Sequence, residues 1–481
     1  MGKSVLVGSA FIFFALHSVA FGQSSAPNST PQGFQTGAII AKVTCLKASD
    51  QSYALYLPSQ YTREKKWPIV YAFDPDALGS RPVEAMKAAA ERYGHIVVGS
   101  NNGHNGLWKA EAEIAQVMFV DTQARLSIDT KRLYFSGFSG GARFASSVAQ
   151  ICKCAAGLLL DGAGFEAGSP PVAGGNFAVF ATAGNIDFNY IELVNLDAKF
   201  DTLHYEHAFR TFEGPHQWAP ASVMDEAFAW FRLMAMKDGR ETPDPGFVSE
   251  QAAAAESRAK ALEAAGDPYG AWKEYRQAAE TFDGLAGAAA EDAAFRERAT
   301  ALEKEKAVRD GAKQEQDDFR EQTERFAPIS SGLSTLRLNT ENPGDLRDQL
   351  TPQILQIYAS AQHEKNPEKL RVLQRTLGSV FVQAMEAGDD LYEAKDYWRA
   401  RYFYELGAVA EPDSSWTWRS VAESRAMTGD RKGACEAIRR ARDKAKDPAA
   451  FYAWLNDDPA FAKLRDTAEF RAVAAKATET K

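Results

Sequence analysis

The sequence has no excess of basic residues. Its 55 Lys and Arg are outnumbered by 64 Asp and Glu, which gives a formal net charge of -9. Proteins that bind nucleic acid rely on clustered Lys and Arg to contact phosphate groups, so this balance argues against a nucleic-acid partner. It gives no support to a polyanionic substrate either.

Long apolar runs are missing after residue 21, so no later segment is predicted to span a bilayer. Before that point, Lys3 precedes an apolar stretch from Val5 to Phe21, and Ala20-Phe21-Gly22 offers small residues at a signal-peptidase site. We interpret residues 1–22 as a signal peptide, with an uncleaved anchor helix as the alternative, and residues 23–36 as a disordered leader. The mature protein is expected to be exported, periplasmic or secreted, and free of the membrane.

Cysteine is scarce, with four residues in the chain. Cys152 and Cys154 close a predicted helix, and no second pair stands at the spacing of a zinc site, so no metal site is predicted. In an oxidising compartment, a bridge from Cys45 to Cys152 or Cys154 is one interpretation. Small buried apolar residues are the other.

Residues 37–237 alternate between short apolar strands and helices. The clearest strands are 67–73, 132–136, 155–160, 177–181 and 203–212, and helices are expected between them. Strands that are apolar on both sides and alternate with helices predict an α/β fold, in which helices cover both faces of a doubly wound, mostly parallel sheet. Chemistry in such sheets gathers at the carboxyl ends of the strands.

Strand signal is lacking from residue 248 to residue 481, where an all-α domain is expected after a linker at 238–247 that contains two prolines. Ala400, Tyr404 and Gly407 have counterparts 34 residues later in Ala434, Ile438 and Ala441, and Asp396 and Asp430 share this offset. The same internal spacing recurs upstream in Asp267, Ala271, Tyr275 and Ala278. This spacing resembles tetratricopeptide repeats, in which small residues let the two helices of a hairpin pack closely. An irregular helical bundle is the alternative. The resemblance implies a concave surface suited to a protein or peptide partner.

The main chemical signal is Gly137-Phe138-Ser139-Gly140-Gly141, between a predicted strand and a predicted helix. A nucleophile on such a turn adopts a strained conformation, and the flanking glycines avoid clashes with neighbouring backbone. The turn lifts the Ser139 hydroxyl to the N-terminus of a helix, whose dipole favours a developing anion. Ser139 is therefore the predicted nucleophile, and a Ser/Gly-rich turn without catalysis is the alternative.

A catalytic acid is expected after a later strand. Asp187 lies in the loop after strand 177–181, where it can accept a hydrogen bond from a catalytic imidazole. Asp161, at the end of strand 155–160, is the rival acid. We favour Asp187, because its loop follows the second strand after the nucleophile. A helix N-cap is its alternative role.

The predicted base is His216, in the Gly214-Pro215-His216 loop after the last strand. His204 and His207 are inferior candidates, because both are expected within that strand, on opposite faces, which also excludes them as a metal pair. His95 and His104 precede Ser139 and so have the wrong chain order.

These motifs make residues 37–237 resemble the α/β-hydrolase superfamily. The likeness is to the serine esterase branch with polyhydroxyalkanoate depolymerase-like and feruloyl or acetylxylan esterase-like enzymes. It rests on the sequences around Tyr53–Pro58, Arg132–Arg143 and Gly214–Trp218, in the chain order Ser, Asp, His. The loop after residue 73 departs from the His-Gly type common in lipases.

The oxyanion hole is expected to use the backbone N–H of Gly140 and that of Asp76 or Ala77. Trp108 and Trp218 are candidate substrate-binding residues, with core or rim packing as the alternative.

The sequence thus predicts an exported serine hydrolase that cleaves carboxylic esters through an acyl-enzyme, without metal or organic cofactor. The substrate would be a small-molecule or polymer-attached ester. A serine peptidase of the same fold, and a catalytically inert protein that binds a partner through its helical repeats, are the alternatives.

Overall fold

The computed structural model describes residues 33–105, 108–338 and 341–475. The predicted signal peptide and most of the predicted leader lie outside this range. Within it, no helix has both the length and the apolar character that crossing a membrane requires.

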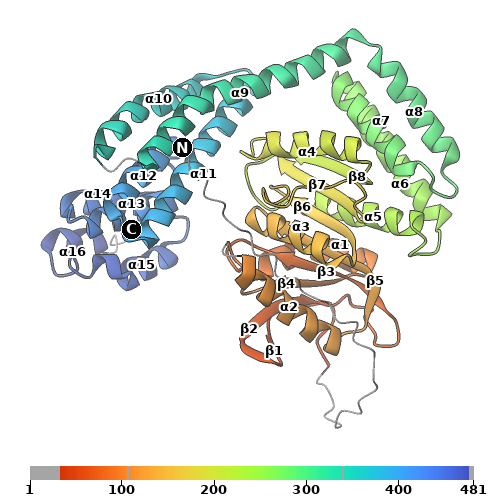
Figure 1. Cartoon of the computed structure of the whole chain (residues 1–481), viewed down its shortest axis with the longest axis horizontal. Helices are drawn as coiled ribbons and strands as arrows, with labels where there is room; N and C mark the ends of the chain where they lie inside the picture. Colours follow the sequence, from red (N-terminus) through yellow and green to blue (C-terminus); the bar gives the residue numbers. More distant parts are fainter. Residues whose placement is uncertain (1–32, 106–107, 339–340, 476–481) are drawn as a thin grey trace, which may run out of the picture. The chain divides into compact units, whose positions relative to one another are not determined.

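An eight-stranded sheet forms the first part of the described chain (Figure 1), in the spatial order β1-β2-β4-β3-β5-β6-β7-β8. β1 pairs with β2 and β2 with β4 in antiparallel fashion, whereas all later neighbours are parallel. This confirms the predicted mostly parallel sheet. The strands are β1 (Ile39–Cys45), β2 (Ala48–Tyr56), β3 (Trp67–Phe73), β4 (Ile96–Ser100), β5 (Ile128–Phe138), β6 (Ala155–Asp161), β7 (Ala178–Gly184) and β8 (His207–Phe212).

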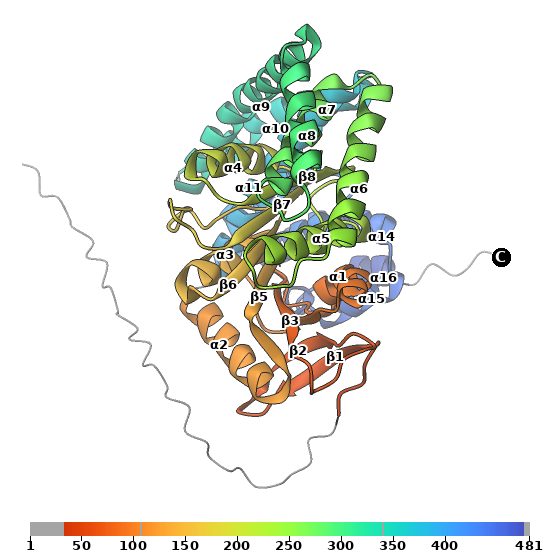
Figure 2. The ribbon, with the colours of Figure 1, turned by 90° about the vertical axis from the view of Figure 1, so that its right-hand side faces the viewer.

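Helices cover both faces of the sheet, as β3 illustrates because every residue of this strand is buried. Val70 and Ala72 share a core with α1 (Ser80–Tyr93) and α5 (Ala221–Lys237). On the opposite face, the Tyr71 ring packs against Phe119 of α2 (Trp108–Arg125), and Phe73 packs against the first turns of α3 (Gly140–Cys152). Figure 2 shows α5 on one side of the strands and α2 on the other.

The last strand is shorter than predicted. Residue 203 ends α4 (Tyr190–Leu203), and His204 closes that helix in a left-handed conformation with φ of 57°. β8 therefore begins at His207. The prediction that His204 and His207 both lie in the strand is wrong, because a helix cap intervenes.

The core of the sheet continues into the next helices, α6 (Pro245–Ala264), α7 (Pro268–Phe282) and α8 (Ala289–Glu303), across the connection at 238–244. Gln277 of α7 joins them to the edge strand: its side-chain amide donates to His207 O at 2.9 Å and accepts from Phe209 N at 3.3 Å. An uncovered strand edge invites pairing with another chain, so Gln277 protects the end of the sheet. The described residues after Phe34 form one compact unit.

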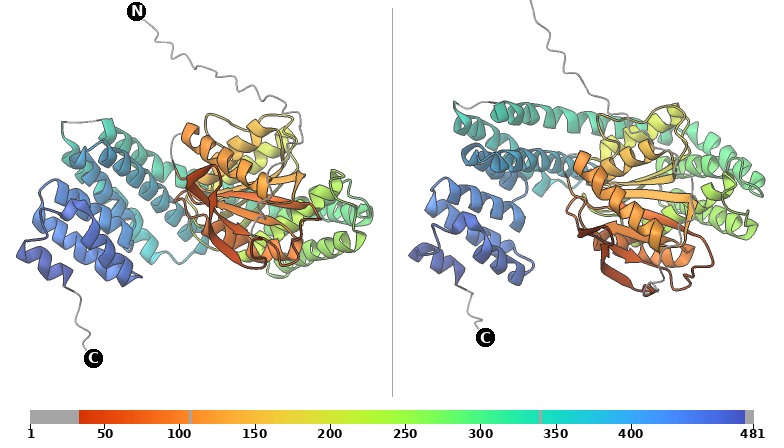
Figure 3. Two further views of the ribbon diagram at one scale, coloured as in Figure 1. Left: turned by 90° about the horizontal axis from the view of Figure 1, so that it is seen from below. Right: turned by 60° about the horizontal axis from the view of Figure 1, so that its bottom comes forward.

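A further core runs from Ile329 to Val473. It is built by α9 (Lys306–Leu338), α10 (Pro343–His363), α11 (Pro367–Glu393), α12 (Tyr397–Ala410), α13 (Ser415–Met427), α14 (Arg431–Lys444), α15 (Pro448–Asp457), a 3-10 turn (Pro459–Phe461) and α16 (Ala468–Ala474). The last of these helices, blue in Figure 3, pack side by side. Strand signal is absent here in the described residues as well, which confirms the predicted all-α region.

The repeat seen in the sequence marks equivalent helix starts. The Asp267, Asp396 and Asp430 side chains cap α7, α12 and α14, and each accepts from the backbone N–H three residues later. A carboxylate at this position satisfies a helical N–H that has no intrahelical partner. The repeated small and apolar residues are also buried in each helix: Ala271, Tyr275, Ala278, Ala400, Tyr404, Gly407, Ala434, Ile438 and Ala441.

Of the two interpretations of the cysteines, the bridge from Cys45 is not formed, and burial as a small apolar residue holds for Cys45 and Cys435 but not for Cys152 and Cys154. Cys152 and Cys154 form a disulfide with each other, and Cys45 and Cys435 are buried free thiols. A bridge from Cys45 is therefore wrong. Cys45 ends the outermost strand β1, whereas α3 packs on β5 and β6, which are four and five strands away in the sheet.

Candidate active site

Ser139 occupies the sharp turn between β5 and α3. Its φ of 53° and ψ of -124° place it in a sparsely populated backbone region. The flanking glycines are required by space: a Cβ on Gly137 would lie 2.1 Å from the carbonyl oxygen of Gly141. A Cβ on Gly141 would lie 2.2 Å from that of Phe73. The chain can therefore hold Ser139 in this conformation only because both neighbours lack side chains.

Asp187 lies in the loop after β7 and is fully buried. Its two carboxylate oxygens lie 3.0 and 2.9 Å from Nδ1 of His216, whose loop follows β8. The backbone N–H of Asn189 donates to Asp187 Oδ1 at 2.7 Å and fixes the carboxylate from the other side. The structure thus brings together the acid and the base that the sequence predicts.

The His216 ring lies against the serine turn. Its centroid is 4.4 Å from that of Phe138, the residue before Ser139, and 4.2 Å from that of Phe188. The Ser139 hydroxyl makes no hydrogen bond to His216 or to any other described residue. Such bonds are often long or poorly aligned without substrate and tighten when substrate binds.

Asp161, the rival acid, has a different environment. Its Oδ2 accepts from the backbone N–H of Ala219 at 2.7 Å, whereas its Oδ1 is buried without a hydrogen-bond partner among the described residues. Its backbone oxygen accepts from Ser139 N at 2.9 Å. Burial, together with the nearby Asp187 charge, raises the pKa of the Asp161 carboxyl well above its usual value. Asp161 therefore supports the turn and does not contact the imidazole.

We predict that Asp161→Asn stabilises the protein at neutral pH. In the unfolded chain an aspartate ionises near pH 3.9. Because the folded pKa is raised, the stability that Asp161 contributes is complete below that pH and is lost as pH rises toward the folded pKa. The loss is about 1.4 kcal/mol per pH unit while only the unfolded form is ionised. Asn does not titrate, so the difference in unfolding midpoint should grow as the pH rises above 4. Equal midpoints throughout would contradict the raised pKa.

The two predicted partners of Gly140 in an oxyanion hole already have acceptors. The N–H of Asp76 donates to Asp74 Oδ1 at 3.0 Å, and that of Ala77 donates to the Asp74 carbonyl oxygen at 3.2 Å. The side chain of Asn105, which the sequence does not single out, lies close to Gly140. A Cβ on Gly140 would lie 1.8 Å from Asn105 Oδ1. Asn105 belongs to no recognisable motif. It lies in a loop upstream of the nucleophile and comes close to Gly140 only when the chain folds.

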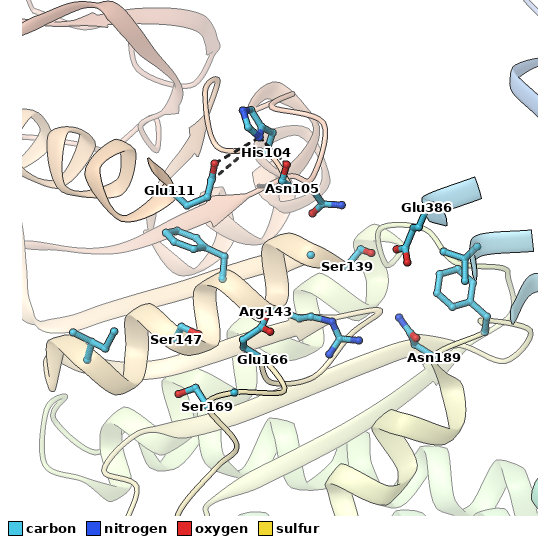
Figure 4. A pocket seen from close by; sticks show the side chains of 16 residues that line it. His104, Asn105, Glu111, Ser139, Arg143, Ser147, Glu166, Ser169, Asn189 and Glu386 are labelled. Carbon is cyan, nitrogen blue, oxygen red and sulfur yellow. Dashed lines mark hydrogen bonds and ion pairs between the residues drawn. The ribbon is translucent and has the colours of Figure 1, made fainter. Parts of the chain in front are cut away.

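A cleft of about 810 Å³ opens in front of Ser139. Figure 4 shows Asn105, Arg143 and Glu386 around the Ser139 side chain. The cleft is lined by His104, Asn105, Glu111, Ser139, Gly140, Arg143, Phe144, Ser147, Ile151, Glu166, Gly168, Ser169, Phe188, Asn189, Val382 and Glu386. Val382 and Glu386 come from α11, so the all-α region contributes a wall.

Of the two predicted substrate-binding tryptophans, Trp218 is not among the residues that line the cleft. Trp108 begins α2, and its side chain lies outside the described part of the structure. Trp218 donates from its ring N–H to Asp74 Oδ2 at 2.8 Å, and its ring packs against Phe138 at a centroid distance of 5.6 Å. Trp218 therefore links the serine turn to the loop after β3.

The cleft carries unpaired negative charge. The Arg143 guanidinium forms a bidentate ion pair with Glu192, in which Nη1 and Nη2 each donate to one carboxylate oxygen at 2.8 Å. The charge of Arg143 is therefore largely balanced. The side chains of Glu166 and Glu386 make no ion pair or hydrogen bond to any described residue. Burial raises the pKa of Glu386, opposed by the nearby Arg143. The unpaired carboxylates favour a ligand group that is cationic or donates hydrogen bonds.

Among the residues that the structure describes, one group of side chains could hold a metal ion: Asp201, His207 and Glu280. The Arg276 guanidinium already lies among them, 3.2 Å from Asp201 and 3.7 Å from Glu280. A fixed guanidinium repels a metal cation, so this group is an ion-pair cluster that links β8 to α4 and α7. None of its residues lines the cleft at Ser139.

The strand order, the serine turn after β5 and the loops after β7 and β8 together decide the fold. The first part of the chain has the α/β-hydrolase fold. No family model matches the chain, and no protein of curated function matches it significantly.

Similar solved structures include a fluorophosphonate-binding serine hydrolase F from Staphylococcus aureus (12% identity, 41% of this chain and 99% of that chain, TM-score 0.33). A ferulic acid esterase is 15% identical, with 41% of this chain and 98% of that chain covered and a TM-score of 0.34. An esterase from Pyrobaculum calidifontis is 11% identical, with 42% of this chain and 86% of that chain covered and a TM-score of 0.35. At these identities and TM-scores, we draw no conclusion about this chain from them.

Proposed function

We propose that the protein is a serine hydrolase that cleaves carboxylic esters, with Ser139 as nucleophile, His216 as base and Asp187 as acid. The observation that carries the proposal is the contact between the Asp187 carboxylate and His216 Nδ1, beside a serine in a strained turn. Three separate loops supply these residues at the carboxyl ends of β5, β7 and β8. A structural serine would need neither the strained turn nor the paired imidazole.

The mechanism follows from which atoms are free. Asp187 accepts from Nδ1 of His216, which leaves Nε2 of the neutral imidazole as a proton acceptor. Ser139 Oγ attacks the ester carbonyl carbon while its proton passes to His216. The imidazolium then gives that proton to the departing alkoxide, which leaves as an alcohol. Water then attacks the acyl carbonyl carbon and loses a proton to His216. The bond from the acyl carbon to Ser139 Oγ breaks, the imidazolium returns the proton to Oγ, and the acid product leaves.

The oxyanion of the tetrahedral intermediate needs donors beside Ser139. We assign the backbone N–H of Gly140, which begins α3 and lines the cleft, and the side-chain amide of Asn105. The N–H of Ser139 is engaged with Asp161, and those of Asp76 and Ala77 with Asp74. Donors aimed at the developing charge typically contribute a factor of about 10²–10³ to kcat.

A peptidase is the second candidate. A peptidase that acts at chain ends needs a charged side chain to hold the peptide terminus, and the unpaired Glu386 carboxylate lines the cleft that holds Ser139. Parallel assays on p-nitrophenyl esters and on amino acid p-nitroanilides separate the two activities. The ester proposal expects turnover of the esters and little of the anilides.

We also propose that the chain is exported and that its helical repeats are tetratricopeptide-like and bind a protein or peptide. Export is supported by the sequence of residues 1–22. The repeats are supported by the equivalent Asp caps and buried positions of α7, α12 and α14.

A fluorophosphonate probe tests the proposed function. Wild type should be labelled and should hydrolyse short p-nitrophenyl esters, whereas Ser139→Ala should lose labelling and about 10⁴-fold or more in kcat. Ser147→Ala is the matched control, because this hydroxyl also belongs to α3 and lines the same cleft. It should be labelled like wild type. Labelling that persists in Ser139→Ala would overturn the assignment.

A further inference from the structure

One face of α11 runs along the loops of the proposed active site. Arg371, Arg375, Gly378, Val382 and Glu386 follow one another at intervals of three or four residues, so they form a single stripe on the helix. Each member of this α11 stripe meets a residue of the α/β-hydrolase part or lines the cleft. The contacts lead from the His216 loop, through the Asp187 loop, to Ser139.

Arg375 holds the loop of the proposed acid. It is buried, with 5% of its surface exposed. Its Nη1 donates to the backbone oxygen of Asn185 at 2.9 Å, and its Nε donates to Gln322 Oε1 at 2.8 Å. The guanidinium also lies over the Tyr190 ring, 4.9 Å from its centroid. Three different partners thus fix the Arg375 guanidinium, and one of them, Asn185, lies two residues before Asp187 in the chain.

Asn185 passes this restraint to the loop of the proposed base. Its Oδ1 accepts from the backbone N–H of Gly214 at 3.2 Å, and its N–H donates to Phe212 O at 2.8 Å. Arg375 therefore acts on the Asp187 loop and, through Asn185, on the loop that carries His216. At the outer end of the stripe, Arg371 pairs with Glu213 at 2.9 Å.

Gly378 lets the helix approach the aromatic ring that covers the imidazole. A Cβ at this position would lie 3.3 Å from Cβ of Phe188, which is tighter than ordinary van der Waals contact. Phe188 in turn packs on His216, with ring centroids 4.2 Å apart. A methyl group at this position of α11 would thus press on Phe188, whose ring packs on the imidazole.

Glu386 ends the stripe inside the cleft. Figure 4 shows its carboxylate across the cleft from Ser139. It has no described ion-pair partner, and Arg143, which lines the same cleft, is already bound to Glu192. A carboxylate in this position complements an ammonium group on the substrate, close to the bond that Ser139 would attack.

We propose that α11 is part of the active site: Arg375 positions the Asp187–His216 pair, and Glu386 selects substrates that carry an ammonium group near the scissile ester. The inference rests on the proposed function, because positioning and selection are defined for that triad. The all-α region then serves catalysis directly, in addition to any partner that it binds.

The positioning role is tested with Arg375→Gln in the full chain, against Arg347→Gln. Like Arg375, Arg347 is bound to a buried side chain, here that of Glu405, but within the all-α region. Arg375→Gln should lower kcat and the fluorophosphonate labelling rate on the order of ten- to a hundredfold, with KM little changed, because triad geometry is lost. Arg375→Lys, which keeps a cationic donor, should recover part of the rate. Arg347→Gln should keep both rates even if its unfolding midpoint falls.

Gly378→Ala separates positioning from stability. Alanine favours a helix more than glycine does, so the unfolding midpoint should not fall below that of wild type, while labelling slows several-fold. This variant carries the test if Arg375→Gln does not fold. Wild-type labelling rates in folded Arg375→Gln, or in Gly378→Ala, would overturn the positioning role.

Selection by Glu386 is tested with alanine p-nitrophenyl ester, which carries a free ammonium, and with p-nitrophenyl propionate, its uncharged analogue. Wild type should favour the ammonium ester in kcat/KM, and Glu386→Gln should lower the ratio of the two values about tenfold. An unchanged ratio, with Ser139 still labelled by the probe, would overturn the selection alone. Loss of labelling in wild type would instead overturn the proposed function.

Discussion

Asp187→Asn should lower kcat about 10⁴-fold while the protein stays folded. The side chain is fully buried and both carboxylate oxygens face His216 Nδ1. An Asn amide has nearly the same shape, so packing is kept. If its NH₂ faces the ring, Nδ1 becomes the acceptor and Nε2 carries the hydrogen, which leaves no group to take the Ser139 proton. Nor can a neutral amide offset the charge of an imidazolium.

Asp161→Asn is the matched control for this prediction. Both aspartates are buried, and both end a neighbouring strand or begin the loop after it. The Asp161 side chain, however, accepts from Ala219 N and does not touch His216. Its replacement should leave kcat within a few-fold of wild type. The kcat of both variants is measured by stopped-flow or steady-state ester hydrolysis, and circular dichroism checks that both are folded. Comparable losses in the two would refute the assignment of Asp187 as the acid.

Truncation after Lys237 should abolish folding. The core of the sheet continues into α6, α7 and α8, where Phe247, Tyr275 and Phe282 are buried against it. Removing them exposes a continuous apolar surface on α5 and the strands beneath it, which favours aggregation. The edge of β8 also loses the Gln277 contacts to His207 and Phe209. The expected result is insoluble protein, or soluble protein without cooperative thermal unfolding.

A cut after Asp317 provides the control. It keeps the buried Val308 and the contact of Tyr269 with Glu315 at 2.8 Å, which close the first core, and it removes Ile329 and the rest of the second. This shorter chain should be soluble and unfold cooperatively, yet react slowly with a fluorophosphonate, because α11 is gone. If the cut after Lys237 gives an equally stable protein, the two parts are independent.

Local signals accounted for much of the fold. The strand 67–73 was predicted from an uninterrupted apolar run, and it is β3, buried throughout. The turn at Ser139 was predicted because glycine spacing reports backbone crowding, and the Gly137 and Gly141 contacts show that crowding. The placement of His204 in a strand was wrong, because the end of a helix and the start of a strand have similar sequences over a few residues.

The site was predictable only in part. Asp187 and His216 follow strands, and the ends of neighbouring parallel strands converge, so chain order was enough to pair them. Asn105 was missed because it depends on where an upstream loop folds over Gly140. The backbone N–H of Asp76 or Ala77 was expected to contribute to the oxyanion hole, but both N–H groups donate to the buried Asp74.

The sequence by itself determined the α/β part, the all-α part and the three residues of the proposed triad, because each leaves a local pattern of apolar spacing, glycine or turn residues. Tertiary structure alone decided that Glu386 lines the same cleft as Ser139, and that Arg375 and Gly378 meet the loop of Asp187. They are more than 230 residues from it in the chain. No local pattern reports such contacts, since they depend on the packing of α11 against loops that fold separately.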